Sequence, residues 1–265
     1  MISYPAIDPI AVSIGPISVH WYGIMYLIGF ASAYLLGMYR AKHSNGLWTS
    51  EMVSDAIFYG AMGVIFGGRI GYILFYQFPA FVDDPLTIVR IWEGGMSFHG
   101  GLLGVIAAMF FFSRRYNKHL VDVTDFLAPF IPIGLGAGRL GNFIGSELWG
   151  KPTDVSWAMV FPNDPEQLAR HPSQLYQFAL EGVVLFGILW FFSKKSKPRY
   201  CVSGLFLLCY GIFRILVEFV RQPDAQIGYL AFNWVTQGQI LSLPMVIIGA
   251  GLVIFGFKIK VFPKN

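Results

Sequence analysis

The stretch LAPFIPIGLGAGRLGNFIGSELWG, from Leu127 to Gly150, turns from apolar to polar within a few helical turns. Its first half has the composition of a helix in a membrane or in a protein core. Its second half sets Arg139, Asn142 and Glu147 among glycines, which let a backbone or a ligand approach closely. Two interpretations are open: a polar ligand site in a membrane helix, or a glycine-lined helix contact that leads into a polar loop.

The composition of the whole chain favours a membrane protein. Of the 265 residues, 55% are hydrophobic and 13% are charged, whereas an ordinary soluble domain carries about 25% charged residues. We therefore predict an all-α integral membrane protein with a single polytopic domain over residues 1–265. The first residues lack the basic region of a cleavable signal peptide, so the first apolar run is expected to be a retained helix. Cys201 and Cys209 share one apolar stretch, which predicts neither a disulfide framework nor a CxxC metal site.

A membrane span needs about 20 apolar residues, and seven runs of the sequence satisfy this. The predicted spans are 17–39, 52–76, 97–113, 120–140, 173–192, 201–221 and 238–257. If the N-terminus lies outside, twelve lysines and arginines fall on the inner side and four on the outer side, as the positive-inside rule requires. The C-terminus is then cytoplasmic, and residues 77–96 and 141–172 form two segments on the outer side, which we call the arm and the head. Because the net charge of +4 reflects this topology, no nucleic-acid partner is expected.

Three arginines, Arg69, Arg139 and Arg214, fall within predicted spans. Each costs at least ~2.5–3.5 kcal/mol on insertion scales, and each is expected in the outer half of its helix. An anionic ligand would explain them, since the guanidinium fork binds phosphate bidentately and stays charged. Alternatively, each arginine pairs with an internal carboxylate or caps carbonyls. Glu218 lies four residues after Arg214, on the same helical face. Glu181 is a buried acid on the fifth span that fits either a proton relay or a hydrogen bond between helices, and we expect the second.

The segment MSFHGGLLG, Met96–Gly104, contains a second candidate group, His99. A histidine near the outer interface could accept a proton near neutral pH, or it could be a hydrogen-bonded interfacial side chain. Both interpretations stay open. Tyr22 and Tyr26 on the first span and His171 before the fifth are expected on the same side of the membrane. The sequence contains no HExxH, Walker or GxSxG motif.

Two other classes of protein fit part of this pattern. A transporter for an organic anion or a lipid headgroup would also use intramembrane arginines and broken, glycine-rich helices. It should show repeats related in topology and polar groups near the midplane, whereas the predicted number of spans is odd and the charge gathers toward the outer face. A scaffold protein would leave the cost of the arginines unexplained.

Five segments, in order, resemble the bacterial prolipoprotein diacylglyceryl transferases over essentially the full length of the chain. The family signature G-R-x-G-N-F-x-N-x-E-x-x-G compares with GRLGNFIGSELWG at Gly138–Gly150. The other segments are WYGIMYLIGF in the first span, HGGLLG from His99, HPSQLYQ from His171 and YGIFRILVEFVRQPD from Tyr210 to Asp224. The sequence departs from the signature at one position. Gly145 stands where the signature has its second asparagine, so the contacts of that asparagine's side-chain amide are lost.

The resemblance implies an enzyme that moves the diacylglyceryl group of phosphatidylglycerol to the lipobox cysteine thiol of a prolipoprotein. A thioether forms and glycerol phosphate is released, without a metal or organic cofactor. The resemblance also implies a multi-pass protein of the bacterial inner membrane with its active site toward the outer leaflet. Arg139 and Arg214 match the family's essential arginines, and His99 is the candidate base for the thiol. The expected substrate-binding residues are Tyr26, Asn142, Glu147, Gly150, His171, Tyr210 and Glu218. Among these, Glu218 is expected to hold Arg214 in place.

Overall fold

The computed structural model describes residues 2–5, 7–15, 17–90, 92, 94–223 and 228–263. Asp224, the last residue of the segment that begins at Tyr210, lies outside these residues, as do residues 91 and 93 of the expected arm. In chain order the elements up to residue 144 are β1 Ile10–Ile14, β2 Ile17–His20, α1 Trp21–Lys42, α2 Ser50–Tyr76, α3 Phe78–Asp83, η1 Pro85–Val89, α4 Phe98–Arg115, α5 Leu120–Leu127 and α6 Ile131–Ile144. The later elements are β3 Met159–Val160, β4 Ala169–Arg170, α7 Ser173–Gln177, the π-helical segment η3 Phe178–Val184, α8 Leu185–Phe192, α9 Cys201–Glu218 and α10 Gln237–Ile259.

The described residues contain five helices long and apolar enough to cross a membrane. These are α1, α2, the continuous helix Ser173–Phe192, α9 and α10. The bent pair of α5 and α6 adds a sixth if it forms one span, while α4, in the range of the predicted third span, is not among them. The helical membrane class of the protein is therefore confirmed. The count of seven spans and the sides of the two termini stay predictions.

The predicted span 120–140 differs from the structure in a way that its prolines explain. The chain breaks between α5 and α6 and turns by 52° there. Pro129 lies in the break and Pro132 in the first turn of α6. Proline removes a backbone donor and disfavours helical geometry in the residue before it. Helix α6 then continues to Ile144, so the expected head segment starts at Gly145 rather than at residue 141.

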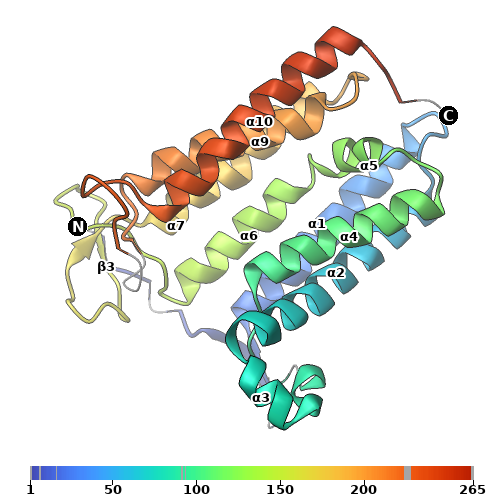
Figure 1. Ribbon diagram of the computed structural model, residues 1–265. Coiled ribbons are helices and arrows are strands. Elements are labelled where there is room, and N and C mark those ends of the chain that lie inside the picture. Colours follow the sequence, from blue (N-terminus) through green and yellow to red (C-terminus); the bar gives the residue numbers. More distant parts are fainter. Residues whose placement is uncertain are drawn as a thin grey trace. The chain divides into compact units, whose positions relative to one another are not determined.

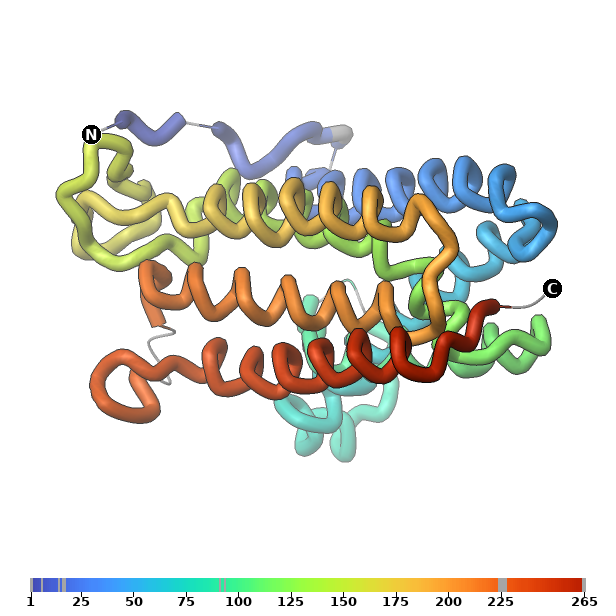
Figure 2. Tube along the Cα trace, turned by 90° about the horizontal axis from the view of Figure 1, so that it is seen from above, coloured from blue at the N-terminus to red at the C-terminus, as the bar shows by residue number. Residues whose placement is uncertain are grey.

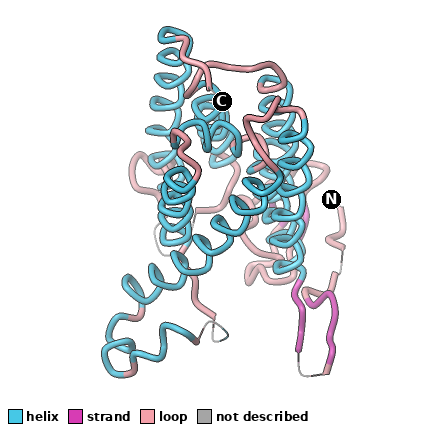
Figure 3. Tube along the Cα trace, turned by 90° about the vertical axis from the view of Figure 1, so that its right-hand side faces the viewer, coloured by secondary structure: helices cyan, strands magenta, loops and turns pink. Residues whose placement is uncertain are grey.

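Two short hairpins were not predicted. Strands β1 and β2 pair antiparallel just before α1 (Figure 3), so the first residues of the predicted span 17–39 are a strand. Strands β3 and β4 pair antiparallel within the expected head segment. A bidentate ion pair holds this second hairpin, because the Arg170 Nε donates to an Asp164 oxygen at 2.6 Å and its Nη2 donates to the other at 3.0 Å.

The chain divides into two compact units, Met1–Leu36 with Asp125–Lys264, and Gly37–Thr124, and each is described by itself. In the first unit, α9 and α10 run side by side along their length (Figures 1 and 2). Gly204 and Gly249 face each other there, and a methyl group on Gly204 would lie 2.9 Å from the Gly249 carbonyl oxygen. Such close backbones are typical of membrane helices joined by small residues.

The second unit contains α2 and α4, which also pack through glycines. A methyl group on Gly67 would lie 2.4 Å from the Gly100 carbonyl oxygen, and one on Gly63 would lie 2.7 Å from that of Gly104. The glycines around His99 therefore have a structural role in bringing these two helices together.

Candidate functional site

Two of the three intramembrane arginines meet in the first unit, around a completely buried carboxylate. The Arg139 Nη2 of α6 lies 3.2 Å from Glu181 Oε2, and the Arg214 Nη1 of α9 lies 4.0 Å from Glu181 Oε1. The Glu181 side chain has no exposed area, whereas the side chains of Arg139 and Arg214 keep 19% and 15%. Because the arginines form the accessible part of this cluster, a ligand that reaches it meets positive charge.

A second buried carboxylate, Glu218, fixes Arg214 from the next turn of α9. Its Oε1 lies 2.6 Å from Arg214 Nη2 and 3.4 Å from Arg221 Nη1. The other oxygen, Oε2, accepts a hydrogen bond of 2.7 Å from Thr236, which caps α10. The predicted pairing of Arg214 with Glu218 is thus confirmed.

Helix packing explains how Arg139 reaches Glu181. Helix α6 crosses η3 at Gly136 and Gly182, where a methyl group on either residue would come within 3.1 Å of the other's Cα. Arg139 lies three residues after Gly136, and Glu181 directly precedes Gly182. π-Helical turns are rare and occur frequently at functional sites. Here the π-helix η3 carries the carboxylate between two arginines.

Of the two tyrosines predicted to bind substrate, Tyr210 lies next to this cluster, whereas Tyr26 contacts Tyr22. The Tyr210 phenol of α9 adjoins the Arg139 guanidinium. On α1, the hydroxyl groups of Tyr22 and Tyr26 are 3.3 Å apart. The Tyr22 ring packs on Gly141 of α6, which lies next to Asn142. The structure therefore brings the start of α1 against the polar end of α6.

The end of α6 and the following loop present the other signature residues. Asn142 accepts a backbone hydrogen bond of 2.9 Å from Glu147, whose side chain is exposed. Gly145 has a φ of −73°, a value open to any residue. Its carbonyl accepts a hydrogen bond of 3.0 Å from the Asn163 side chain, so a neighbouring amide does lie at this position.

Gly150 lies where three backbone segments meet. It donates to the carbonyl of His171 at 2.8 Å, and it bridges to Arg221 in an antiparallel pair. A methyl group here would lie 2.6 Å from both the His171 Cβ and the Val220 carbonyl oxygen. Because Gly150 has no side chain, the loop that contains it packs directly against the segment that contains Arg221. Burial lowers the pKa of His171, whose Nδ1 lies 3.1 Å from the Tyr176 hydroxyl.

His99 and Arg69 belong to the second unit and are described within it. His99 is exposed in the first turn of α4. Arg69 is buried, and its guanidinium donates to five carbonyl groups, those of Thr87, Ile88, Arg90, Gly94 and Gly95. A guanidinium has five N–H donors, so Arg69 has none left for an anion. It anchors the arm segment.

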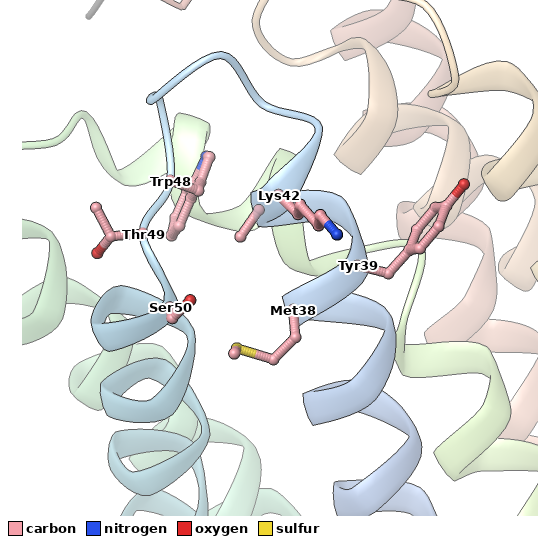
Figure 4. Close-up of a pocket in the computed structure, with 7 residues that line it drawn as sticks. Met38, Tyr39, Lys42, Trp48, Thr49 and Ser50 are labelled. Carbon is pink, nitrogen blue, oxygen red and sulfur yellow. The ribbon is translucent and has the colours of Figure 1, made fainter.

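The second unit also contains a cavity of about 570 Å³ between the end of α1 and the start of α2 (Figure 4). Its lining includes Met38, Lys42 and Trp48, and none of the predicted site residues. Among the residues that the structure describes, no group of three His, Cys, Asp or Glu side chains could hold a metal ion.

Glu181 makes the contact between helices that was expected from the sequence, but two buried glutamines, Gln174 and Gln177, were not predicted as site residues. The Gln174 amide nitrogen donates to the Glu147 carbonyl at 2.6 Å. Three polar residues at positions 174, 177 and 181 of a predicted membrane helix share one helical face. That spacing was the available signal, and it was not used. Arg221, which follows the end of α9, also contacts Glu218.

Comparison with known proteins gives the same family as the five motifs. The family model described as prolipoprotein diacylglyceryl transferase matches residues 9–255. A phosphatidylglycerol–prolipoprotein diacylglyceryl transferase of Marinomonas sp. (strain MWYL1) is 86% identical over 264 residues, covering 100% of this chain and 98% of the relative. Proteins of the same name from Ectopseudomonas mendocina (strain ymp) and Coxiella burnetii (strain RSA 331 / Henzerling II) are 59% and 58% identical, covering 97% and 98% of this chain and 97% and 99% of their own. The chain therefore belongs to the prolipoprotein diacylglyceryl transferase family.

Proposed function

We propose that this protein transfers the diacylglyceryl group of phosphatidylglycerol to the lipobox cysteine of prolipoproteins, the first step of bacterial lipoprotein maturation. The observation that carries the proposal is the buried cluster of Arg139, Arg214, Glu181 and Glu218, in a chain 86% identical to a protein of that name. In this reaction the thiol sulfur forms a bond to the terminal glycerol carbon of the diacylglyceryl group. The bond between that carbon and the phosphate oxygen breaks, and glycerol phosphate leaves with the electron pair.

Arg139 and Arg214 are the proposed catalytic cations. Negative charge grows on the phosphate oxygen as the carbon–oxygen bond breaks, and preorganised donors stabilise such charge best where water is scarce. Arg214 supports this role, because its Nη1 is buried and has no hydrogen-bond partner in the described part of the chain. Glu218 is the proposed positioning residue, since its short ion pair holds Arg214 in one orientation.

The remaining predicted residues are proposed to bind the substrates. The Tyr210 phenol offers a hydrogen bond beside Arg139, the Tyr26 phenol offers one on α1 next to Tyr22, and Asn142 with Glu147 shapes the headgroup end. Gly150 and His171 keep the loop in place against the segment of Arg221. Two contacts support this proposal: Tyr210 adjoins Arg139, and Gly150 pairs with Arg221, which contacts Glu218.

A thiol has an unperturbed pKa near 8.5 and must lose its proton to become a good nucleophile. We propose that His99 is the base that accepts this proton. The alternative is the field of the arginines, which favours the thiolate without a base.

The proposed topology has seven spans, with the N-terminus periplasmic, the C-terminus cytoplasmic and the site toward the outer leaflet of the inner membrane. The excess of lysine and arginine in the expected inner loops supports this orientation. Phosphatidylglycerol and the signal peptide would both reach the site from the bilayer.

A transfer assay tests this function. Purified protein in liposomes receives phosphatidylglycerol with labelled acyl chains and a lipobox peptide with Cys or Ser at the acceptor position. We expect label on the Cys peptide alone, and its loss in Arg139→Ala. The control Arg115→Ala changes an exposed arginine that pairs with Asp55 in the second unit, and it should keep full activity. Labelling of neither peptide by the wild-type protein would reject the proposal.

A further inference from the structure

Three polar side chains form a buried row along one face of α7 and η3. Gln174, Gln177 and Glu181 have no exposed area. The two glutamines are three residues apart, and Glu181 follows four residues later, so each is a neighbour of the next on the helix surface, with Cβ atoms about 5–6 Å apart. The row leads from the Glu147 carbonyl, which Gln174 contacts, to the arginine cluster at Glu181.

Several polar atoms of this row have no hydrogen-bond partner within the described residues. They are both side-chain atoms of Gln177, the Oε1 atoms of Gln174 and Glu181, and the Arg214 Nη1 that faces Glu181. Buried polar groups are nearly always hydrogen-bonded in folded proteins, and an apolar side chain could be buried here at lower cost than an amide without a partner. These atoms therefore indicate that the row binds a polar group from outside the described residues.

The chemistry of the row limits what that group is. A glutamine amide is uncharged and both donates and accepts hydrogen bonds, which matches a hydroxyl group that does the same. The neighbouring arginines present positive charge, so they favour a phosphate and disfavour a headgroup that ends in an ammonium. An anionic headgroup with a phosphate at one end and free hydroxyl groups at the other matches both the glutamines and the arginines.

We infer that the side-chain amide of Gln177 and the side-chain Oε1 of Gln174 bind the hydroxyl groups of the headgroup glycerol. Arg139 and Arg214 then bind the phosphate. This inference rests on the proposed function, whose donor lipid carries that glycerol. Gln177 is then a specificity-determining residue, because it distinguishes a glycerol phosphate from a phosphate alone.

Inhibition of the transfer reaction by two different anions distinguishes binding of the headgroup glycerol from binding of the phosphate. Glycerol phosphate and inorganic phosphate are compared as inhibitors of wild-type protein and of Gln177→Met, which keeps the side-chain length and removes both the donor and the acceptor of the amide. We expect glycerol phosphate to inhibit the wild type more strongly than phosphate does. In Gln177→Met this advantage should fall by about tenfold or more, as the loss of two hydrogen bonds predicts, while inhibition by phosphate stays unchanged.

Gln239→Met is the matched control. Gln239 is also a buried glutamine with an unpartnered Nε2, but it caps α10 through its bond to Thr236. This variant should alter both inhibitors alike and leave their ratio unchanged. If Gln177→Met also leaves the ratio unchanged, whether activity falls or not, Gln177 has a structural role at most and the inference is wrong.

Two further measurements keep the test decisive. If Gln177→Met does not fold, Gln177→Asn, which keeps the amide but shortens its reach, should reduce the same ratio. The thermal stability of the protein with each inhibitor reports binding without turnover. If the wild-type protein transfers no lipid, the proposed function fails, and the difference in stabilisation by the two inhibitors still decides whether Gln177 binds the glycerol.

Discussion

Glu181→Gln is the most informative single change, because Glu181 lies between the two arginines of the site. At an effective dielectric constant of about 20, charges at the observed separations of 3.2 and 4.0 Å attract by about 5 and 4 kcal/mol. The cost of burying the carboxylate offsets much of this. Removing one partner from a buried ion pair typically destabilises a protein by about 3–5 kcal/mol. Glutamine keeps one acceptor oxygen, so we expect a loss near the lower end, about 3 kcal/mol.

Such a loss corresponds to a fall in Tm of about 6–12 °C for a chain of this size. The assay is thermal unfolding in detergent, followed by tryptophan fluorescence, with transfer activity measured below the Tm. Activity should fall by about tenfold or more, because Arg139 loses the group that orients it and the arginines repel each other more strongly.

Glu166→Gln is the control for a carboxylate in an exposed ion pair. Glu166 pairs with Arg170, but its side chain is 63% exposed, and such pairs contribute at most about 1 kcal/mol. Its Tm should therefore fall by less than about 4 °C. If Glu181→Gln has the Tm and activity of the wild type, the carboxylate is solvated in the membrane protein and the charge-compensated cluster described above does not exist.

Three further variants test other parts of the structure. In Gly182→Ala the added methyl group would meet the Gly136 Cα at 2.9 Å, so we expect about 1–3 kcal/mol of destabilisation by overpacking, measured as Tm, and lower transfer activity. The ion pair with Arg170 holds the pKa of Asp164 below its usual range, so this carboxylate stabilises the fold above about pH 4 and the stability is lost as the pH falls through its folded pKa. Asp164→Asn should lower the Tm at pH 7 and flatten the acid side of the Tm–pH curve. In Gly145→Asn the new Cβ would meet only ordinary contacts, the nearest at 3.4 Å, so activity should persist and the Tm should stay equal or rise by the equivalent of up to about 1 kcal/mol.

The spans and one ion pair were predictable because their signals are local. The fifth span was predicted at 173–192, which are the bounds of the continuous helix from Ser173 to Phe192. Arg214 and Glu218 are four residues apart on one helix, and that spacing alone brings their side chains together. Arg139 was already a candidate as an arginine within a predicted span, and the resemblance to the family distinguished it and Arg214 from Arg69, which their place in the spans could not do.

Contacts between distant segments were not predictable from the sequence. Arg139 and Glu181 come together only where α6 crosses η3 at two glycines. Neither segment contains a sequence pattern that identifies the other as its partner. The π-helical geometry of η3 also lacks a residue pattern of its own. At Gly145 the sequence suggested a contact that the structure supplies in another way. Comparison with the signature suggested a lost amide contact, whereas the structure places the Asn163 amide against this position.

The three intramembrane arginines show why the cost of a buried charge does not by itself identify a site. All three carry the same penalty when the sequence is considered alone. Arg69 directs its donors to five backbone carbonyls of one segment, so its charge is used within the fold. Arg139 and Arg214 face carboxylates instead and keep part of their surface accessible, and the Nη1 of Arg214 lies near Glu181 without a hydrogen bond. Unused hydrogen-bonding capacity, rather than the presence of the charge, is therefore the feature on which we propose that Arg214 binds a ligand and Arg69 does not.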